Sequence, residues 1–142
     1  GCFDDASVQI ATLVKVFNSN EDIFNPNSPK VILNNNSEAI YFSRSAIPFV
    51  RGKEKEDWKF FRKYYKHIGL YAYRTDVLKQ ITLLPQSSLE LSESLEQLRW
   101  IENGYKIKVV ETSLETLAVD TPEDLEKVKI YATSMLNDKE KD

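Results

Sequence analysis

The stretch 65–74 (Tyr-Lys-His-Ile-Gly-Leu-Tyr-Ala-Tyr-Arg) gathers side chains that could bind a polar ligand. It is rich in aromatic and branched residues and lacks proline, which predicts a β-strand. Alternate strand residues point to opposite faces, so an imidazole, two phenols and a gap should share one face: His67, Tyr71, Tyr73 and Gly69. The other face should pack on the core: Ile68, Leu70 and Ala72. The first face either holds a ligand or consists of tyrosines that only stack.

Arg44 lies between two serines, where a predicted hairpin ends. Its planar guanidinium can bind a carboxylate through two parallel hydrogen bonds. The alternative is an ordinary surface arginine.

Glu96 and Gln97 are consecutive residues of a helix expected over 89–103, so their side chains should point about 100° apart. Both lie off the apolar stripe formed by Leu91, Leu95 and Leu98. A carboxylate and an amide can together accept and donate hydrogen bonds to sugar hydroxyls. The alternative is an exposed helix face with no ligand.

Asp120 stands directly before Thr121 and Pro122, which predict the start of a helix. Thr121 is the expected N-cap, so Asp120 is not needed for capping. A carboxylate at a junction between a strand and a helix can hold a divalent metal near phosphates. The alternative is that Asp120 only favours the positive end of the helix.

The strands that would position these residues are expected at 8–17, 30–33, 38–42, 65–74 and 107–110. The first is apolar on both faces, as in the centre of an α/β sheet. The second and third should form a hairpin through Asn34, Asn35 and Asn36, because asparagine tolerates positive φ.

Helices are expected over 75–82, with Thr75 as N-cap, over 89–103, ending before Gly104, and over 121–136. The charged segment 52–63 should be a short helix or a mobile insertion on a solvated face. Strands and helices alternate in the second half, so the predicted class is α/β with a β-hairpin insertion.

Composition limits the classes of protein to which the chain can belong. Its 142 residues fit one domain, and 42% hydrophobic with 29% charged residues is typical of a folded protein. A net charge of −3 argues against a nucleic-acid partner, and the single cysteine, Cys2, fits a reducing compartment. No apolar run of about 18 residues is present, which argues against a membrane span. The chain starts at Gly1, just ahead of a strand, so we expect a fragment of a longer protein.

Several segments, in this order, resemble the family of 3-deoxy-manno-octulosonate cytidylyltransferases, also called CMP-Kdo synthetases. They are Phe-Asn-Pro-Asn at 24–27, Tyr-Phe-Ser-Arg-Ser-Ala-Ile-Pro at 41–48, His-Ile-Gly-Leu-Tyr-Ala-Tyr-Arg at 67–74, Leu-Glu-Gln-Leu-Arg at 95–99 and Val-Asp-Thr-Pro-Glu-Asp-Leu-Glu at 119–126. The resemblance covers nearly the whole chain as the C-terminal half of such a protein.

This resemblance implies the C-terminal part of a Rossmann-like, nucleotide-sugar-transferase-like three-layer fold with a mixed sheet. It implies transfer of CMP from CTP to Kdo, an acidic sugar of lipopolysaccharide, by a cytoplasmic homodimer with Mg²⁺. The sugar would contact five residues: Arg44, His67, Tyr71, Glu96 and Gln97. Asp120 would bind the magnesium ion, and the attacking hydroxyl would belong to the sugar, so no enzyme nucleophile is expected. The CTP-binding N-terminal half is missing, so the fragment alone should be inactive.

Two alternatives stay open. One is a cytidylyltransferase for another acidic sugar of the sialic-acid type. The other is a non-catalytic module that dimerises through its apolar strands.

Overall fold

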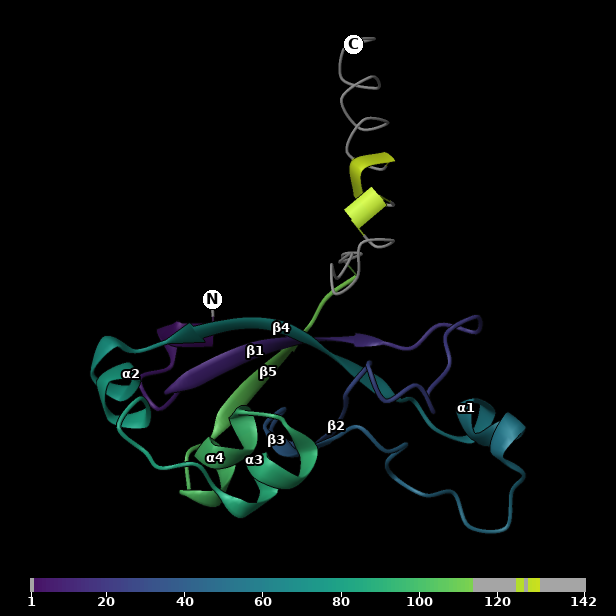
Figure 1. Ribbon diagram of the computed structural model, residues 1–142, viewed down its shortest axis with the longest axis horizontal. Coiled ribbons are helices and arrows are strands. Elements are labelled where there is room, and N and C mark those ends of the chain that lie inside the picture. The colour runs from purple at the N-terminus through teal and green to yellow at the C-terminus, as the bar shows by residue number, and fades with distance from the viewer. Residues whose placement is uncertain (1, 114–124, 127, 131–142) are drawn as a thin grey trace, which may run out of the picture.

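The computed structural model describes residues 2–113, 125–126 and 128–130. Within them, five strands form one open mixed sheet in the order β3-β2-β4-β1-β5 (Figure 1). The strands are β1 (Ile10–Val16), β2 (Lys30–Leu33), β3 (Ala39–Ser43), β4 (Tyr65–Tyr73) and β5 (Ile107–Glu111). Strand β1 pairs with β5 in parallel and with β4 in antiparallel orientation, and β2 pairs antiparallel with β3 and β4. The predicted α/β class and its hairpin are confirmed.

The turn between β2 and β3 differs from the expectation in one detail. The residue with positive φ is Ser37, at 56°, and none of the three asparagines adopts this conformation. Asn34 instead accepts hydrogen bonds through its side-chain oxygen from the backbone amides of Asn36 and Glu38, both at 2.9 Å. The asparagine therefore stabilises the turn from its side chain.

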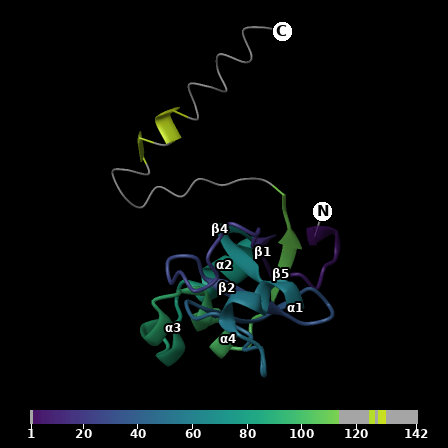
Figure 2. The ribbon, with the colours of Figure 1, turned by 90° about the vertical axis from the view of Figure 1, so that its right-hand side faces the viewer.

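Three helices of the described chain cover one face of the sheet: α2 (Thr75–Ile81), α3 (Ser88–Glu93) and α4 (Gln97–Glu102). In both views α3 and α4 lie together on the same side of the sheet (Figure 1; Figure 2). Helix α2 was expected to be capped by Thr75, which was wrong. Arg74 is the N-cap and Thr75 is the first helical residue.

The helix expected over 89–103 is broken into α3 and α4. Helix α3 starts at Ser88 with Ser87 as N-cap, where the Glu90 carboxylate accepts from the Ser87 amide at 3.2 Å while the Ser87 hydroxyl makes no hydrogen bond within the described residues. Ser94 ends the helix in the left-handed region with φ 51°. The break rotates the leucines away from a single stripe, so Leu95 and Leu98 are buried while Leu91 is 63% exposed. Gly104 follows α4 with φ 83°, as its predicted position past a helix end requires.

The core lies between β1 and the helices. The face of β4 that packs against it is the one that was expected to face outward. Ile10, Thr12 and Val14 of β1 are buried, and they pair with Tyr73, Tyr71 and His67. The phenol-and-imidazole face is therefore the inner face. Of the residues expected on the core face, Ile68 is buried, whereas Leu70 is 61% exposed and Ala72 is exposed. The tyrosines belong inside because their rings pack edge-on against Trp100 of α4, with centroids 5.1 Å away for Tyr71 and 5.6 Å for Tyr73.

The charged segment 52–63 contains two short helical turns, η2 (Lys55–Asp57) and α1 (Trp58–Phe61). The short helix was one of the two forms expected for this segment. The segment is not only a solvated face, because Trp58 is buried in a second apolar cluster with Phe17, Ile23 and Tyr64. A further turn, η1 (Cys2–Asp4), precedes β1.

Part of the last predicted helix is seen as helix at 125–126 and 128–130. The rest of 121–136, with its predicted cap, lies outside the described residues. Among the residues described, no helix combines the length and apolar character needed to cross a bilayer.

Candidate functional site

Arg44 joins the end of the hairpin to the junction between α3 and α4. Its guanidinium donates to three backbone carbonyls: Glu93 through Nε at 2.7 Å, Pro26 through Nη1 at 2.9 Å and Ser94 through Nη2 at 3.2 Å. The Glu93 carboxylate accepts in return from the Arg44 amide at 2.9 Å and from Ser43 Oγ at 2.6 Å. A guanidinium has five N–H groups, so these contacts orient it and leave donors for a ligand.

Lys30 supports Arg44 from within the fold, and sequence reasoning missed it. The residue is fully buried, and its ammonium donates to the backbone carbonyls of Arg44 and, at 2.9 Å, of Asn25. The Lys30 pKa lies below its ordinary value, because burial lowers it by more than the nearby charges of Asp22 and Glu93 raise it. Lys30 thus links the Asn-Pro turn to the backbone of Arg44. The sequence signal for Lys30 was a lysine at the first position of a predicted strand whose other residues are apolar.

His67 and Tyr71 of β4 lie among aromatic rings. The His67 ring is 5.0 Å from the Phe42 ring and 5.2 Å from the Tyr71 ring. Burial lowers the pKa of His67 to about 4, so the imidazole is neutral at neutral pH. Burial also raises the pKa of Tyr71, with smaller contributions from Tyr73 and Glu96, while the nearby Thr12 hydroxyl lowers it. The Tyr71 hydroxyl is buried and has no hydrogen-bond partner among the described residues.

Glu96 and Gln97 do not share the exposed helix face that was expected as the alternative. Glu96 is the N-cap of α4, and its side chain is 64% exposed, with its carboxylate 3.8 Å from Arg99. Gln97 is buried, and its Nε2 has no hydrogen-bond partner within the described part of the chain. Their different burial follows from the break at Ser94, which places them at the start of a new helix.

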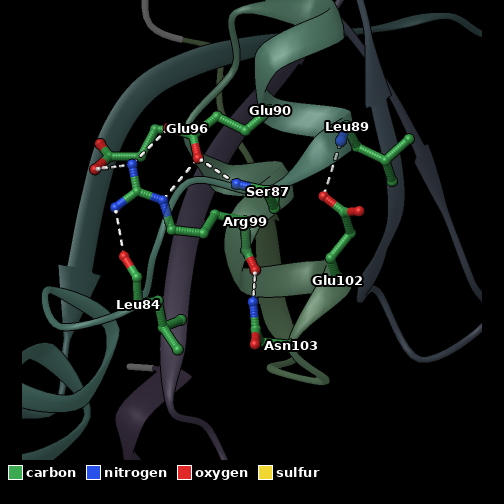
Figure 3. A network of polar contacts seen from close by, with 8 residues as sticks. All are labelled: Leu84, Ser87, Leu89, Glu90, Glu96, Arg99, Glu102 and Asn103. Carbon is green, nitrogen blue, oxygen red and sulfur yellow. Dashed lines mark hydrogen bonds and ion pairs between the residues drawn. The ribbon is translucent and has the colours of Figure 1, made fainter.

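Arg99 holds α3 and α4 together beneath this start (Figure 3). It donates to both carboxylate oxygens of Glu90, through Nε at 2.7 Å, and to the Leu84 carbonyl at 3.3 Å. Glu90 also accepts from the Ser87 amide at 3.2 Å, and its pKa is lowered by Arg99. The sequence analysis did not single out this pair, which sets the geometry of the α3–α4 junction.

Contacts connect the predicted sugar residues across three elements. Arg44 binds Ser94, which lies two residues before Glu96, and Trp100 of α4 contacts Tyr71. His67 contacts Phe42, which lies two residues before Arg44. Among the described residues, three buried side-chain atoms have no hydrogen-bond partner: Tyr71 OH, Ser87 Oγ and Gln97 Nε2. Buried polar groups are rarely left without a partner, so the Tyr71 hydroxyl and the Gln97 amide are groups that a polar ligand could pair. Their roles toward a sugar stay predictions.

Asp120 lies outside the described residues, so its predicted metal role has no geometry to report. Within the part of the chain that is described, no group of three or more His, Cys, Asp or Glu side chains could hold a metal ion. A hollow of about 600 Å³ lies where the parallel strands β1 and β5 end, which is where α/β sheets commonly bind ligands. It is lined by Lys15, Val16, Asn18, Glu111, Thr112 and Ser113.

The known proteins to which the chain is similar are cytidylyltransferases. The family model described as Cytidylyltransferase matches residues 3–108. The chain is 66% identical over 134 residues to a 3-deoxy-manno-octulosonate cytidylyltransferase of Parabacteroides distasonis, covering 92% of this chain and 53% of the relative. For the same-named protein of Bacteroides thetaiotaomicron, the identity is 65%, with the same coverages.

A solved structure is also similar: CMP:2-keto-3-deoxy-manno-octonic acid synthetase complexed with CTP. The TM-score is 0.83 at 39% identity, covering 95% of this chain and 53% of that chain. The chain therefore spans about half the length of the relatives it matches.

Proposed function

The chain belongs to the cytidylyltransferase family, and from this premise we propose that it is the acceptor-sugar half of a protein that transfers CMP from CTP to Kdo. The observation that carries the proposal is the 66% identity to a Kdo cytidylyltransferase over 92% of the chain. The assignment to the C-terminal half stays a prediction, and the gene sequence upstream of Gly1 tests it.

In the proposed reaction, the anomeric hydroxyl oxygen of Kdo forms a bond to the α-phosphorus of CTP. The bond from that phosphorus to the bridging oxygen breaks, the hydroxyl proton is lost, and pyrophosphate leaves. The nucleophile belongs to the substrate, so the protein contributes position and charge. The rest of the protein would bind CTP, and this half alone would be inactive.

Arg44 is proposed to bind the carboxylate of Kdo. Its guanidinium is already oriented by the carbonyls of Pro26, Glu93 and Ser94, so little conformational freedom remains to be lost on binding. His67, Tyr71, Glu96 and Gln97 are proposed to bind the sugar hydroxyls. The buried, unpaired groups of Tyr71 and Gln97 support this assignment.

Asp120 is proposed to bind Mg²⁺, which would neutralise phosphate charge when bound. A carboxylate suits this hard cation, which prefers oxygen ligands. We also propose a cytoplasmic homodimer whose product enters lipopolysaccharide synthesis.

The test is to incubate the intact protein with CTP, Mg²⁺ and either Kdo or N-acetylneuraminic acid, and to separate the products by anion exchange. We expect CMP-Kdo and pyrophosphate with Kdo, and little product with the sialic acid. Faster turnover of the sialic acid would reassign the substrate. An absence of CMP-sugar with both acids would favour a non-catalytic module and overturn the proposal.

A further inference from the structure

Thr12 lies at an irregularity in the pairing of β1 with β4. Thr12 pairs with Tyr71, and the next residue, Leu13, pairs with Ile68, so Gly69 and Leu70 have no partner on β1. Such bulges re-aim side chains and are common next to functional sites. Thr12 itself is buried, and its hydroxyl faces the interrupted part of the ladder.

The Thr12 hydroxyl contacts three polar atoms of β4. Its Oγ1 lies 2.9 Å from the Leu70 carbonyl oxygen, 3.3 Å from the Ile68 carbonyl oxygen and 3.0 Å from His67 Nε2. A hydroxyl has one hydrogen to donate, and a carbonyl oxygen can only accept. Two oxygens without a hydrogen between them repel at these distances, so the hydroxyl hydrogen points toward the carbonyls.

The hydroxyl then has only a lone pair to offer His67. Nε2 must carry the hydrogen, and a neutral imidazole has one N–H group, so Nδ1 is left as an acceptor. Burial of the ring keeps it neutral, because it lowers the His67 pKa to about 4. Within the described chain, Nδ1 makes no hydrogen bond of its own.

We propose that Thr12 is a positioning residue that holds His67 in its Nε2–H tautomer, so that Nδ1 accepts a hydrogen bond from a ligand hydroxyl. The tautomer rests on the contacts of the Thr12 hydroxyl with the Leu70 and Ile68 carbonyl oxygens, which take its one hydrogen. The ligand hydroxyl rests on the proposed function, in which it belongs to Kdo.

Nitrogen NMR of the imidazole tests the tautomer directly. His67 is the only histidine of this chain, so its two ring nitrogens need no further assignment. In the intact protein, the two ring-nitrogen signals of His67 are those that disappear from the spectrum of the His67→Gln variant. At neutral pH we expect a protonated Nε2 and an unprotonated Nδ1. A protonated Nδ1 in the unmodified protein would overturn the proposal, whatever the variants show.

Two substitutions test the role of the hydroxyl. Thr12→Val removes it with little change of shape and should populate the Nδ1–H tautomer, whereas Thr12→Ser keeps the hydroxyl and should preserve the original signals. If Thr12→Val does not fold, Thr12→Cys replaces it, because a thiol is a weak acceptor. An unchanged tautomer in the folded Val or Cys variant would contradict the proposal.

Kinetics of the intact protein separate this inference from the proposed function. Thr12→Val should raise the KM for Kdo by about tenfold, which is about 1.4 kcal/mol, with the KM for CTP unchanged. Thr12→Ser should match the unmodified protein. If the tautomer is as expected but Kdo is not a substrate, the proposed function fails and the role of Thr12 in setting the tautomer stands. If Kdo is turned over but the tautomer is reversed, the role of Thr12 fails alone.

Discussion

The burial of His67 makes the free energy of unfolding depend on pH. The pKa of His67 is lowered from 6.5 to about 4 by burial, so the unfolded chain takes up the proton before the folded chain does. The contribution of the neutral, buried His67 ring to the stability of the folded chain is complete above the ordinary pKa of histidine. This contribution is lost as the pH falls toward the pKa of His67 in the folded chain. We expect the His67 contribution to the free energy of unfolding to fall by about 2 kcal/mol between about pH 7 and about pH 5.

Urea unfolding at the two pH values measures this loss, with His67→Gln as the comparison. The variant cannot titrate in this window, so its stability should fall less steeply on acidification. Equal slopes for the two proteins would show that the imidazole is not buried as described.

Asp120→Asn removes the negative charge proposed to bind magnesium. In the intact protein we expect turnover to fall by about a hundredfold or more, because a group that neutralises transferred phosphate charge is worth at least that much. Raising the Mg²⁺ concentration should restore part of the activity. Asp138→Asn in the charged tail is the control, and equal turnover in the two variants would remove Asp120 from the site.

Local sequence patterns predicted the elements that carry the proposed site residues better than the surroundings of those residues. The hairpin, its end at Arg44 and the β4 strand were predictable from local patterns. The buried ammonium of Lys30 was not, because its acceptors, the carbonyls of Asn25 and Arg44, are supplied by tertiary structure. The inner face of β4 was also wrong, since alternation alone does not say which face the helices will cover.

At the scale of elements, the junction between α3 and α4 sets the positions of Glu96 and Gln97. Local spacing predicted one helix, and only the left-handed conformation of Ser94 divides it. A serine rarely adopts that conformation, so a break at Ser94 was hard to predict from local patterns. The Ser-x-x-Glu pattern of Ser87 and Glu90 was the readable signal at the start of α3, and it was not used.

The Glu90–Arg99 pair should stabilise this junction. Glu90→Gln removes the charge that Arg99 binds through two hydrogen bonds and should lower the free energy of unfolding by about 2 kcal/mol. Glu96→Gln is the matched control, because that carboxylate is exposed and 3.8 Å from the same arginine. Its loss should cost less than about 0.5 kcal/mol. Equal losses in urea unfolding would contradict a structural role for the buried pair.

At the scale of the whole molecule, part of the sheet face opposite the helices is apolar. A hollow of about 220 Å³ is lined mainly by Ala11, Leu13, Leu70, Ala72 and Val110. Leu70 is 61% exposed and Val110 41% exposed, so apolar side chains on this face meet solvent. Since the chain spans about half the length of its relatives, we expect this face to cause self-association when the chain is isolated.

Leu70→Ser combined with Val110→Ser should shift the isolated chain toward monomer in sedimentation velocity. Leu83→Ser, at an exposed leucine elsewhere, is the control and should leave association unchanged. If the control reduces association as much as the double variant does, the effect is general hydrophobicity and not this face.

The central claim is that Arg44 binds the carboxylate of an acidic sugar, and the kcat/KM of the intact Arg44→Ala variant for Kdo tests it most directly. Truncating one partner of a hydrogen-bonded charge pair costs about 2 kcal/mol or more, so we expect at least about a thirtyfold loss, with the KM for CTP unchanged. A Kdo analogue with the carboxylate reduced to an alcohol should show almost no difference between variant and unmodified protein. Near-normal kcat/KM for Kdo in Arg44→Ala, or an equal loss with the analogue, would contradict the account.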